Sequence, residues 1–257
     1  MLSIIIPSFH DPLLIRTIDD LLAKCEGTIE VIAVLDGYWP EFELRIDPRV
    51  RYVHLGKNSG MREAINAGVR VSRGEFIMRS DEHCMFGQGF DRIMTESCGP
   101  NWIMTATRYF LDTVKWEKMD LEPYIYEKLK IRDDMKFEGV KWGERARERK
   151  DIMVDETMAM QGSMWLMPRK WWDEVIVELD TEHYGIMYQD SHEMVFKTWK
   201  AGGKLMVNKN TWFAHKHVSF PRTHRHGGQS QDPHIKYCLE TWKDYYLTEI
   251  LPKWSPL

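Results

Sequence analysis

A short apolar run in the chain, Phe76–Met78, is followed closely by three side chains of kinds that bind metals, Asp81, Glu82 and His83. Asp81 and His83 are separated by one residue, so in an extended segment their side chains leave the same side of the chain. A carboxylate oxygen and an imidazole nitrogen that face one point suit a divalent cation such as Mn²⁺, which accepts both ligand types. A solvated acidic turn would also explain the pattern, so the surrounding sequence must decide between the two.

Strand and helix signals alternate along the first hundred residues. Apolar runs bounded by turn residues predict strands, and apolar residues at helical intervals predict helices. The predicted strands cover residues 2–6, 28–37, 49–56 and 75–80, and the predicted helices cover residues 14–22 and 59–74. This alternation predicts an α/β fold with a mostly parallel sheet that is covered on both faces. Ligands of such sheets bind beyond the carboxyl ends of the strands, which is where Asp36 and Asp81 fall.

The second half of the chain has weaker signals. Residues 108–160 are dense in charge and carry scattered aromatic side chains, which predicts an excursion from the fold or a lid. We expect a strand and a helix in residues 162–175, a helix in 191–203 and one or two strands in 204–217. Residues 237–254 predict an aromatic, amphipathic helix that packs against the core or against a second subunit of a homodimer.

Composition excludes several classes of protein. The 257 residues carry a net charge of −4 and a pI of about 6.2, so no global basic field draws in nucleic acid or an anionic membrane. The four cysteines are far apart and form no C-x-x-C pair, which fits a reducing, cytoplasmic location. No apolar stretch is long enough for a membrane span, and the start lacks the features of a signal peptide.

Motifs of other nucleotide-binding and metal enzymes are absent from the sequence. It contains neither G-x-G-x-x-G nor G-x-x-x-x-G-K-[ST], which removes most support for a dehydrogenase or a P-loop protein. It also lacks H-E-x-x-H, which disfavours a zinc hydrolase. A nucleotidyltransferase would normally carry a glycine-rich, basic loop after the first strand, where this chain has PSFHDP.

Three segments occur in an order that resembles the opening half of a family 2 glycosyltransferase of the GT-A fold: SIIIPSF, VIAVLDG and NSGMREAINAGVRVSRGEFIMRSDEH. The family pattern runs from a strand to D-D-G, N-x-G-x-x-x-A-R-N-x-G, G-E-[YF]-I and D-x-D. Its positions are filled here by Asn58, Gly60, Ala64, Asn66, Gly68, Gly74 and Glu75. The Asp81 motif stands where the D-x-D stands, and its D-x-H form is similar to that of the polypeptide N-acetylgalactosaminyltransferases, a related GT-A family.

The resemblance covers residues 2–98 well and residues 160–217 more loosely. It implies one GT-A domain with a Rossmann-like central sheet flanked by helices and a smaller acceptor-side region. We therefore expect a nucleotide-sugar-binding half in residues 1–107, the charged excursion or lid in 108–160, and an acceptor-side and catalytic half with a C-terminal helix in 161–257.

The resemblance also implies a metal-dependent donor site for a nucleotide-diphosphate sugar. Mn²⁺ or Mg²⁺ would be held by Asp81 and His83, with His215 as the third ligand and His217 as the next choice. Asp36 matches the position that accepts a hydrogen bond from the base, usually uracil, which implies a UDP-sugar. The family's arginine is Ile65 here, and Arg62 could replace it. The other donor-contacting residues expected are Pro7, Phe9, Asn58, Gly60, Ser80 and Asp81. Arg222 and Arg225 lie in a basic, glycine-containing segment that could fold over the diphosphate, although a solvated basic loop would also explain its composition.

Asp190 matches the carboxylate that acts as general base in inverting members, where it removes the proton of the acceptor hydroxyl. The usual preceding glutamate is Gln189 in this chain, and a role as helix N-cap would also explain an aspartate at this position. We expect a hexosyltransferase-like, inverting enzyme. A retaining enzyme like the N-acetylgalactosaminyltransferases and a non-catalytic nucleotide-sugar-binding protein are the alternatives. The acceptor stays open among a glycan, a protein, a lipid and a modified nucleic-acid base.

Overall fold

The computed structural model describes residues 1–185, 190–216 and 232–255, without the side chains of Asp190 and Asp232. Its strands are β1 (Leu2–Ser8), β2 (Ile29–Asp36), β3 (Val50–Leu55), β4 (Phe76–Ser80), β5 (Cys84–Phe86), β6 (Trp102–Asp112), β7 (Glu117–Lys118), β8 (Glu127–Ile131), β9 (Phe137–Lys141), β10 (Val154–Glu156), β11 (Met164–Pro168) and β12 (Lys204–His215). Its helices are α1 (Leu14–Lys24), α2 (Met61–Val71), α3 (Phe90–Ser97), α4 (Gly143–Glu148), α5 (Arg169–Trp171), α6 (Asp190–Lys200), α7 (Asp232–Tyr245) and α8 (Leu251–Trp254), with single π-helical turns η1 (Trp172–Ile176) and η2 (Tyr246–Ile250).

One large sheet runs through the molecule. Its strand order, within the described residues, is β10-β12-β6-β11-β4-β1-β2-β3, with β5 paired to β12 and β7 paired to β6. The strands β3, β2, β1 and β4 are parallel, as are β6 and β12, whereas β11 runs antiparallel to β4 and β6. The predicted α/β architecture, with a mostly parallel central sheet, is confirmed.

Helices cover both faces of the parallel strands. All residues of β1 and β2 are buried, as expected for strands with a helix layer on each side. Ile4 belongs to the apolar cluster that contains Leu14 of α1, and Ile5 belongs to the cluster that contains Ala64 of α2. Neighbouring residues of a strand point to opposite faces, so α1 and α2 lie on opposite sides of the sheet.

Two glycines of the N-terminal half permit close approaches that position the strand ends. A Cβ atom on Gly68 of α2 would lie 2.4 Å from Cγ2 of Ile5, so only glycine lets this helix pack so near β1. Gly37 follows β2 with φ +74°, and a Cβ there would lie 2.0 Å from the backbone nitrogen of Asn58. The D-G turn and the N-x-G segment therefore fit together only because residue 37 lacks a side chain.

The charge-dense segment 108–160 is built into the fold. Its first residues lie inside β6, its middle forms the antiparallel β8–β9 hairpin, and its last strand, β10, pairs with β12 at the edge of the sheet. Asp155 of β10 holds α4 in place by accepting hydrogen bonds from Arg145 and Arg149. A lid function for part of this segment stays a prediction.

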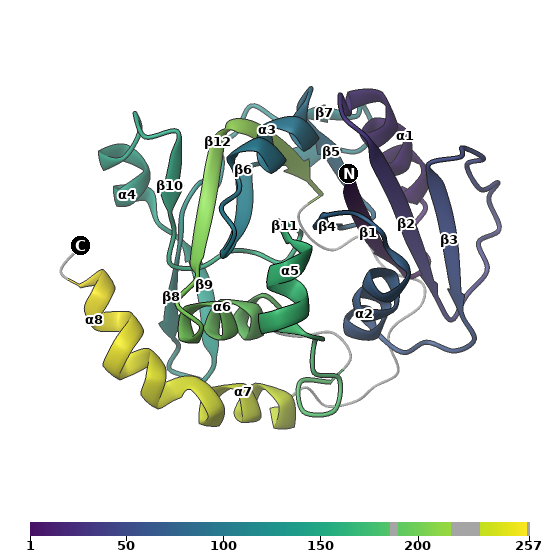
Figure 1. Cartoon of the computed structure of the whole chain (residues 1–257). Coiled ribbons are helices and arrows are strands. Elements are labelled where there is room, and N and C mark those ends of the chain that lie inside the picture. Colours follow the sequence, from purple (N-terminus) through teal and green to yellow (C-terminus); the bar gives the residue numbers. More distant parts are fainter. Residues whose placement is uncertain (186–189, 217–231, 256–257) are drawn as a thin grey trace.

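The C-terminal helices run along one edge of the molecule, below the β8–β9 hairpin in Figure 1. The Tyr246 hydroxyl donates a hydrogen bond of 2.8 Å to the carbonyl of Leu129 in β8. The Trp254 ring packs edge-to-face against the rings of Trp142 and Trp199. These contacts provide the core packing that the amphipathic pattern predicts.

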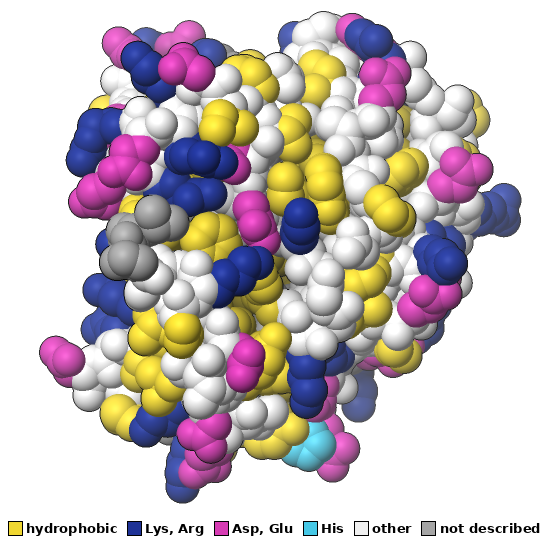
Figure 2. Space-filling model, turned by 60° about the vertical axis from the view of Figure 1, so that its left-hand side comes forward, with side chains coloured by type: hydrophobic (Ala, Val, Ile, Leu, Met, Phe, Trp, Pro, Cys, Tyr) yellow, Lys and Arg dark blue, Asp and Glu magenta, His cyan; other side chains and the backbone are white. Residues whose placement is uncertain are grey.

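The molecular surface carries charges of both signs. On the face shown in Figure 2, Lys and Arg side chains are interspersed with Asp and Glu side chains, and hydrophobic side chains lie in a band between them. None of the helices within residues 1–185, 190–216 and 232–255 has the length and apolar character needed to cross a lipid bilayer.

Candidate functional site

Strand pairing brings the predicted metal ligands together from distant parts of the sequence. The turn that carries Asp81 and His83 connects β4 to the short strand β5. In the antiparallel pairing of β5 with β12, Cys84 lies opposite His215, and the backbone nitrogen of Lys216 donates to the carbonyl of His83. The last residue of β12 is therefore held beside the D-x-H segment.

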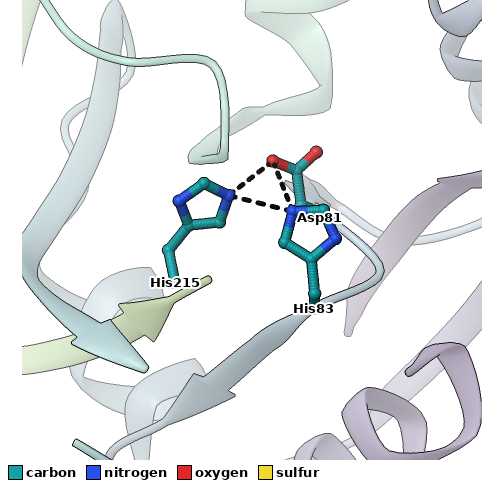
Figure 3. A group of neighbouring side chains, drawn as sticks. All are labelled: Asp81, His83 and His215. Atoms are coloured by element: carbon teal, nitrogen blue, oxygen red, sulfur yellow. Dashed lines mark hydrogen bonds and ion pairs between the residues drawn. The ribbon is translucent and has the colours of Figure 1, made fainter. Parts of the chain in front are cut away.

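The side chains of Asp81, His83 and His215, called here the DHH triad, converge on one point (Figure 3). The Nε2 atom of His215 lies 3.0 Å from Oδ2 of Asp81 and 3.1 Å from Nε2 of His83. The third edge, from His83 Nε2 to Asp81 Oδ2, is 3.8 Å. The structure brings the three predicted metal ligands together, and their binding of a metal stays a prediction.

A buried carboxylate behind the triad orients His83. Asp11, which follows β1 and is fully buried, lies with Oδ2 2.8 Å from Nδ1 of His83. An imidazole that donates its Nδ1 proton to a carboxylate presents the lone pair of Nε2 to its other side. The nitrogen of His83 that faces the triad is therefore the one prepared to bind a cation.

The charges in the site suit a cation as well. Burial alone would raise the pKa of Asp81, but the Arg79 guanidinium and the two imidazoles hold it well below its usual range. Arg79 Nη2 lies 2.6 Å from Oδ1 of Asp81, whereas Oδ2 faces the histidines. Burial lowers the pKa of His215 to about 4, so its ring is neutral at pH 7. Burial also disfavours the charged form of His83, but Asp11 and Asp81 raise its pKa.

The three donors fit a divalent cation that accepts mixed oxygen and nitrogen ligands, such as Mn²⁺. They supply one anionic oxygen and two imidazole nitrogens, and a carboxylate orients one of these rings. Metal ligands need such outer partners to fix the ring and its tautomer. Sequence reasoning missed Asp11 and Arg79, although an acidic residue directly after the first strand and an R-x-D pattern at the end of β4 were visible signals.

Asp36, predicted to contact the donor base, ties the N-x-G segment to the end of β2. Its carboxylate is 2% exposed and accepts hydrogen bonds from the Asn58 side chain and from the backbone nitrogens of Ser59 and Gly60, at 2.9, 2.6 and 2.8 Å. The structure thus brings Asp36, Asn58 and Gly60 together as predicted. In this arrangement the carboxylate oxygens bind the chain's own loop, and a contact with a base stays a prediction.

The remaining predicted donor contacts take different positions. Pro7 is buried within β1, and Ser80 is buried at the end of β4, next to Asp81. The backbone nitrogen of Phe9 donates to the Glu82 carboxylate at 3.0 Å, which joins the end of β1 to the D-x-H turn. A contact of Pro7, Phe9 or Ser80 with the donor stays a prediction.

Arg62 lies in the first turn of α2. It is fully buried, pairs with Glu193 of α6 and donates to the carbonyl of Asp180, and its guanidinium lies over the Tyr184 ring. A contact of Arg62 with a donor base stays a prediction. The pairing with Glu193 makes Arg62 a link between α2 and the helix that begins at Asp190.

Several predicted site residues fall outside the described part of the chain. These are the side chain of Asp190, whose backbone begins α6, and the whole residues Gln189, His217, Arg222 and Arg225.

Known proteins match this chain in family and in fold. The family model of glycosyl transferase family 2 matches residues 3–175. The structure is similar to a crystal structure of GalNAc-T7 with UDP, GalNAc and Mn²⁺, at 17% sequence identity and a TM-score of 0.75, over 100% of this chain and 52% of that chain. It is also similar to S. aureus TarS 1-349, at 11% identity and a TM-score of 0.51, over 84% of this chain and 60% of that chain. No curated protein sequence matches it.

The structural likeness at these identities establishes the fold, which is the predicted GT-A fold, and this chain spans about half the length of the GalNAc-T7 chain. The family match extends from β1 to η1 and includes the D-x-H segment. It covers well over half of the 257 residues. The chain therefore belongs to glycosyl transferase family 2.

Proposed function

We propose that this chain is a glycosyltransferase that depends on a divalent metal and takes its sugar from a nucleotide-diphosphate sugar, with UDP as the nucleotide. One observation carries the proposal. Asp81 Oδ2 and His83 Nε2 both lie within hydrogen-bonding distance of His215 Nε2. A cation at this point would neutralise the diphosphate that leaves when the glycosidic bond of the donor breaks. GalNAc-T7, which shares the fold, was crystallised with UDP and Mn²⁺.

The residues of this chain divide the work in the proposed site. Asp81, His83 and His215 hold the cation, Asp11 fixes the ring of His83, and Arg79 keeps Asp81 ionised. The Asp36 carboxylate holds the N-x-G segment beside the end of β2. In sheets of this kind, ligands bind beyond the carboxyl ends of the parallel strands. Phe9 and Glu82 join the end of β1 to the metal-binding turn, so donor and cation positions are fixed to each other.

We assign the general base to Asp190, the first residue of α6. A hydroxyl is a weak nucleophile near neutral pH, so an inverting transfer needs a carboxylate that takes its proton. The alternative is a retaining transfer, which the D-x-H form of the metal motif favours because it is similar to that of the N-acetylgalactosaminyltransferases. The anomeric configuration of the product distinguishes the two mechanisms.

Titration calorimetry with UDP, in the presence and absence of MnCl₂, tests the metal dependence directly. We expect wild-type protein to bind UDP more tightly with Mn²⁺, and we expect the His83→Ala and His215→Ala variants to lose this gain. The matched control is His54→Ala, because His54 is an exposed histidine on β3, away from the triad. Equal UDP affinity of wild type with and without Mn²⁺ would show that the triad is not a metal site for the donor.

A further inference from the structure

A small cavity lies near the triad. Its volume is about 20 Å³, and its polar lining comes from Thr105, Arg108, Tyr124, Glu127 and Gln161. Thr105 and Arg108 belong to β6, Glu127 begins β8, and Gln161 precedes β11. The cavity has room for about one water molecule or one hydroxyl group.

Two observations place this cavity beside the triad. The Ser163 hydroxyl donates to Oε1 of Gln161 at 3.0 Å, and the Ser163 carbonyl accepts from the backbone nitrogen of Asp81 at 2.9 Å. In the parallel pairing of β6 with β12, Arg108 lies opposite Phe213, two residues before His215 and therefore on the same face. The cavity is thus joined to two of the three triad residues by the chain itself.

Arg108 is a buried cation with a hydrogen-bond donor to spare. Arg108 is 5% exposed, and its Nη2 atom lies 3.3 Å from Oε1 of Glu127. Its Nη1 atom is buried and has no hydrogen-bond partner among the residues that the structure describes. Buried donors in native proteins are paired in the great majority of cases, so this one calls for an oxygen that the described residues do not supply.

Glu127 determines which oxygen the cavity accepts. A carboxylate ligand would pair with Arg108 but would be repelled by the Glu127 carboxylate beside it. A hydroxyl has no such conflict, because it accepts a hydrogen bond from Nη1 of Arg108 and donates its own proton to Glu127. The pair therefore selects a neutral hydroxyl over an anion.

We propose that Arg108 and Glu127 form a subsite for a non-reacting hydroxyl of a carbohydrate acceptor. The inference rests on the proposed function, because it assumes that transfer takes place at the triad. Its position favours the acceptor over the donor sugar as the source of the hydroxyl. The cavity is walled by β6, β8 and the segment before β11. In the sheet order, β6 and β11 lie between β12 and β4, whereas β1 and β2, at whose ends the donor is proposed to bind, lie beyond β4.

The test uses a panel of methyl glycosides of common hexoses with the full chain. Their binding is followed by saturation-transfer NMR in the presence of Mg²⁺ and UDP, and UDP affinity is measured in parallel by calorimetry. The variants are Arg108→Met, which removes the donor, and Glu127→Gln, which keeps the shape but removes the charge. The matched control is Arg145→Met, because Arg145 is a comparably buried arginine that pairs with a carboxylate, Asp155, and does not line the cavity.

We expect at least one glycoside to bind wild type, and both variants to weaken its binding by roughly tenfold or more, as for a lost hydrogen bond to a charged group. UDP affinity should stay at the wild-type value in both variants, and Arg145→Met should keep glycoside binding. If no glycoside binds wild type, or if the variants bind it equally well, the proposal is wrong. If the variants instead weaken binding of UDP-sugars but not of UDP, the hydroxyl belongs to the donor and the acceptor assignment fails. A wild-type protein that does not bind UDP would contradict the proposed function itself.

Discussion

At the scale of single residues, Asp11 controls how the triad can bind a cation. Its carboxylate accepts the Nδ1 proton of His83 at 2.8 Å and is itself fully buried. We predict that Asp11→Ala lowers Mn²⁺ affinity by roughly tenfold to a hundredfold, as is typical for loss of an outer partner of a ligating histidine. Calorimetric titration of Mn²⁺ in the presence of UDP measures the change. The control is Asp134→Ala, an exposed carboxylate on the loop between β8 and β9.

Unchanged Mn²⁺ affinity in the Asp11→Ala variant would mean that the ring of His83 is held in place without Asp11. Binding that is lost altogether, together with a lowered melting temperature, would indicate a structural role, because Asp11 also accepts a hydrogen bond from the backbone nitrogen of Leu13.

A second prediction at this scale concerns Asp190, the proposed general base. We predict that Asp190→Asn lowers turnover by about 10² to 10⁴ and leaves UDP affinity nearly intact, because the amide keeps the shape but cannot accept the proton. Steady-state kinetics of UDP release and calorimetry of UDP binding separate the two effects. Near-normal turnover, or a product with the anomeric configuration of the donor, would contradict an inverting mechanism with this base.

At the scale of secondary structure elements, a buried ion pair joins α2 to α6. Arg62 and Glu193 are both buried, and Lys197 Nζ lies 2.7 Å from Oε1 of Glu193. We predict that Arg62→Met destabilises the protein by roughly 3 kcal/mol or more, since a carboxylate in the core loses its main partner. Chemical denaturation measures the free energy of unfolding. The control, Arg70→Met, breaks an exposed pair on the same helix and should cost less than about 1 kcal/mol.

The double variant Arg62→Met, Glu193→Gln provides the sharper comparison. Because it removes the buried charge along with its partner, we expect it to be more stable than Arg62→Met alone. A double variant that is less stable would show that Glu193 contributes to stability independently of Arg62, through Lys197 and the backbone of Asp180.

Asp155 makes the junction of α4 and β10 sensitive to acid. Burial alone would raise its pKa, but Arg149 and the Tyr126 hydroxyl hold it at about 2. A lowered pKa in the folded state contributes stability above the unfolded value of about 3.9 and loses it as the pH falls toward the folded value. We predict that wild type melts above Asp155→Asn at pH 7 and that the difference shrinks between about pH 4 and pH 2. A difference that stays constant with pH would show that the ionised form of Asp155 contributes nothing.

Local patterns in the sequence predict the elements of the parallel half and most of the metal site. The strands β1 to β4 are continuous apolar runs, and their order fixes which ends carry Asp36 and Asp81. His215 could be assigned because the family pattern places a histidine after the final strand. The β8–β9 hairpin and β10 were not predicted, because short, partly exposed strands with many charged residues lack a clear alternation of apolar and polar positions.

Interactions between distant residues are what the sequence could not reveal. Arg62 and Glu193 are 131 residues apart, so nothing near Arg62 indicates that it is buried against α6. Asp36 looks like a ligand for a base because it ends a strand, and its bonds to Ser59 and Gly60 depend on how the following loop folds back. A local pattern gives the position of such a side chain, and only the fold decides what it contacts.

At the scale of the whole molecule, the triad joins residues from the N-terminal and C-terminal halves of the chain. Asp81 and His83 come from the family-matched N-terminal part, and His215 lies beyond it at the end of β12. In the sheet, β6 and β11 lie between β12 and β4, so the strand that carries His215 and the strand that precedes Asp81 belong to the same sheet. A cation bound there would therefore cross-link segments that are more than 130 residues apart, with His83 and His215 separated by 132 positions.

This arrangement predicts that metal and nucleotide together stabilise the whole fold. A ligand at a hundredfold excess over its Kd stabilises the native state by about 2.7 kcal/mol. For a chain of this size that corresponds to a rise in melting temperature of roughly 5 to 10 °C, measured by scanning calorimetry with UDP and MnCl₂. EDTA should reverse the rise, His83→Ala and His215→Ala should abolish it, and His54→Ala should retain it. An equal rise in the double variant His83→Ala, His215→Ala would place the cation elsewhere in the molecule, because that variant lacks both imidazole donors of the triad.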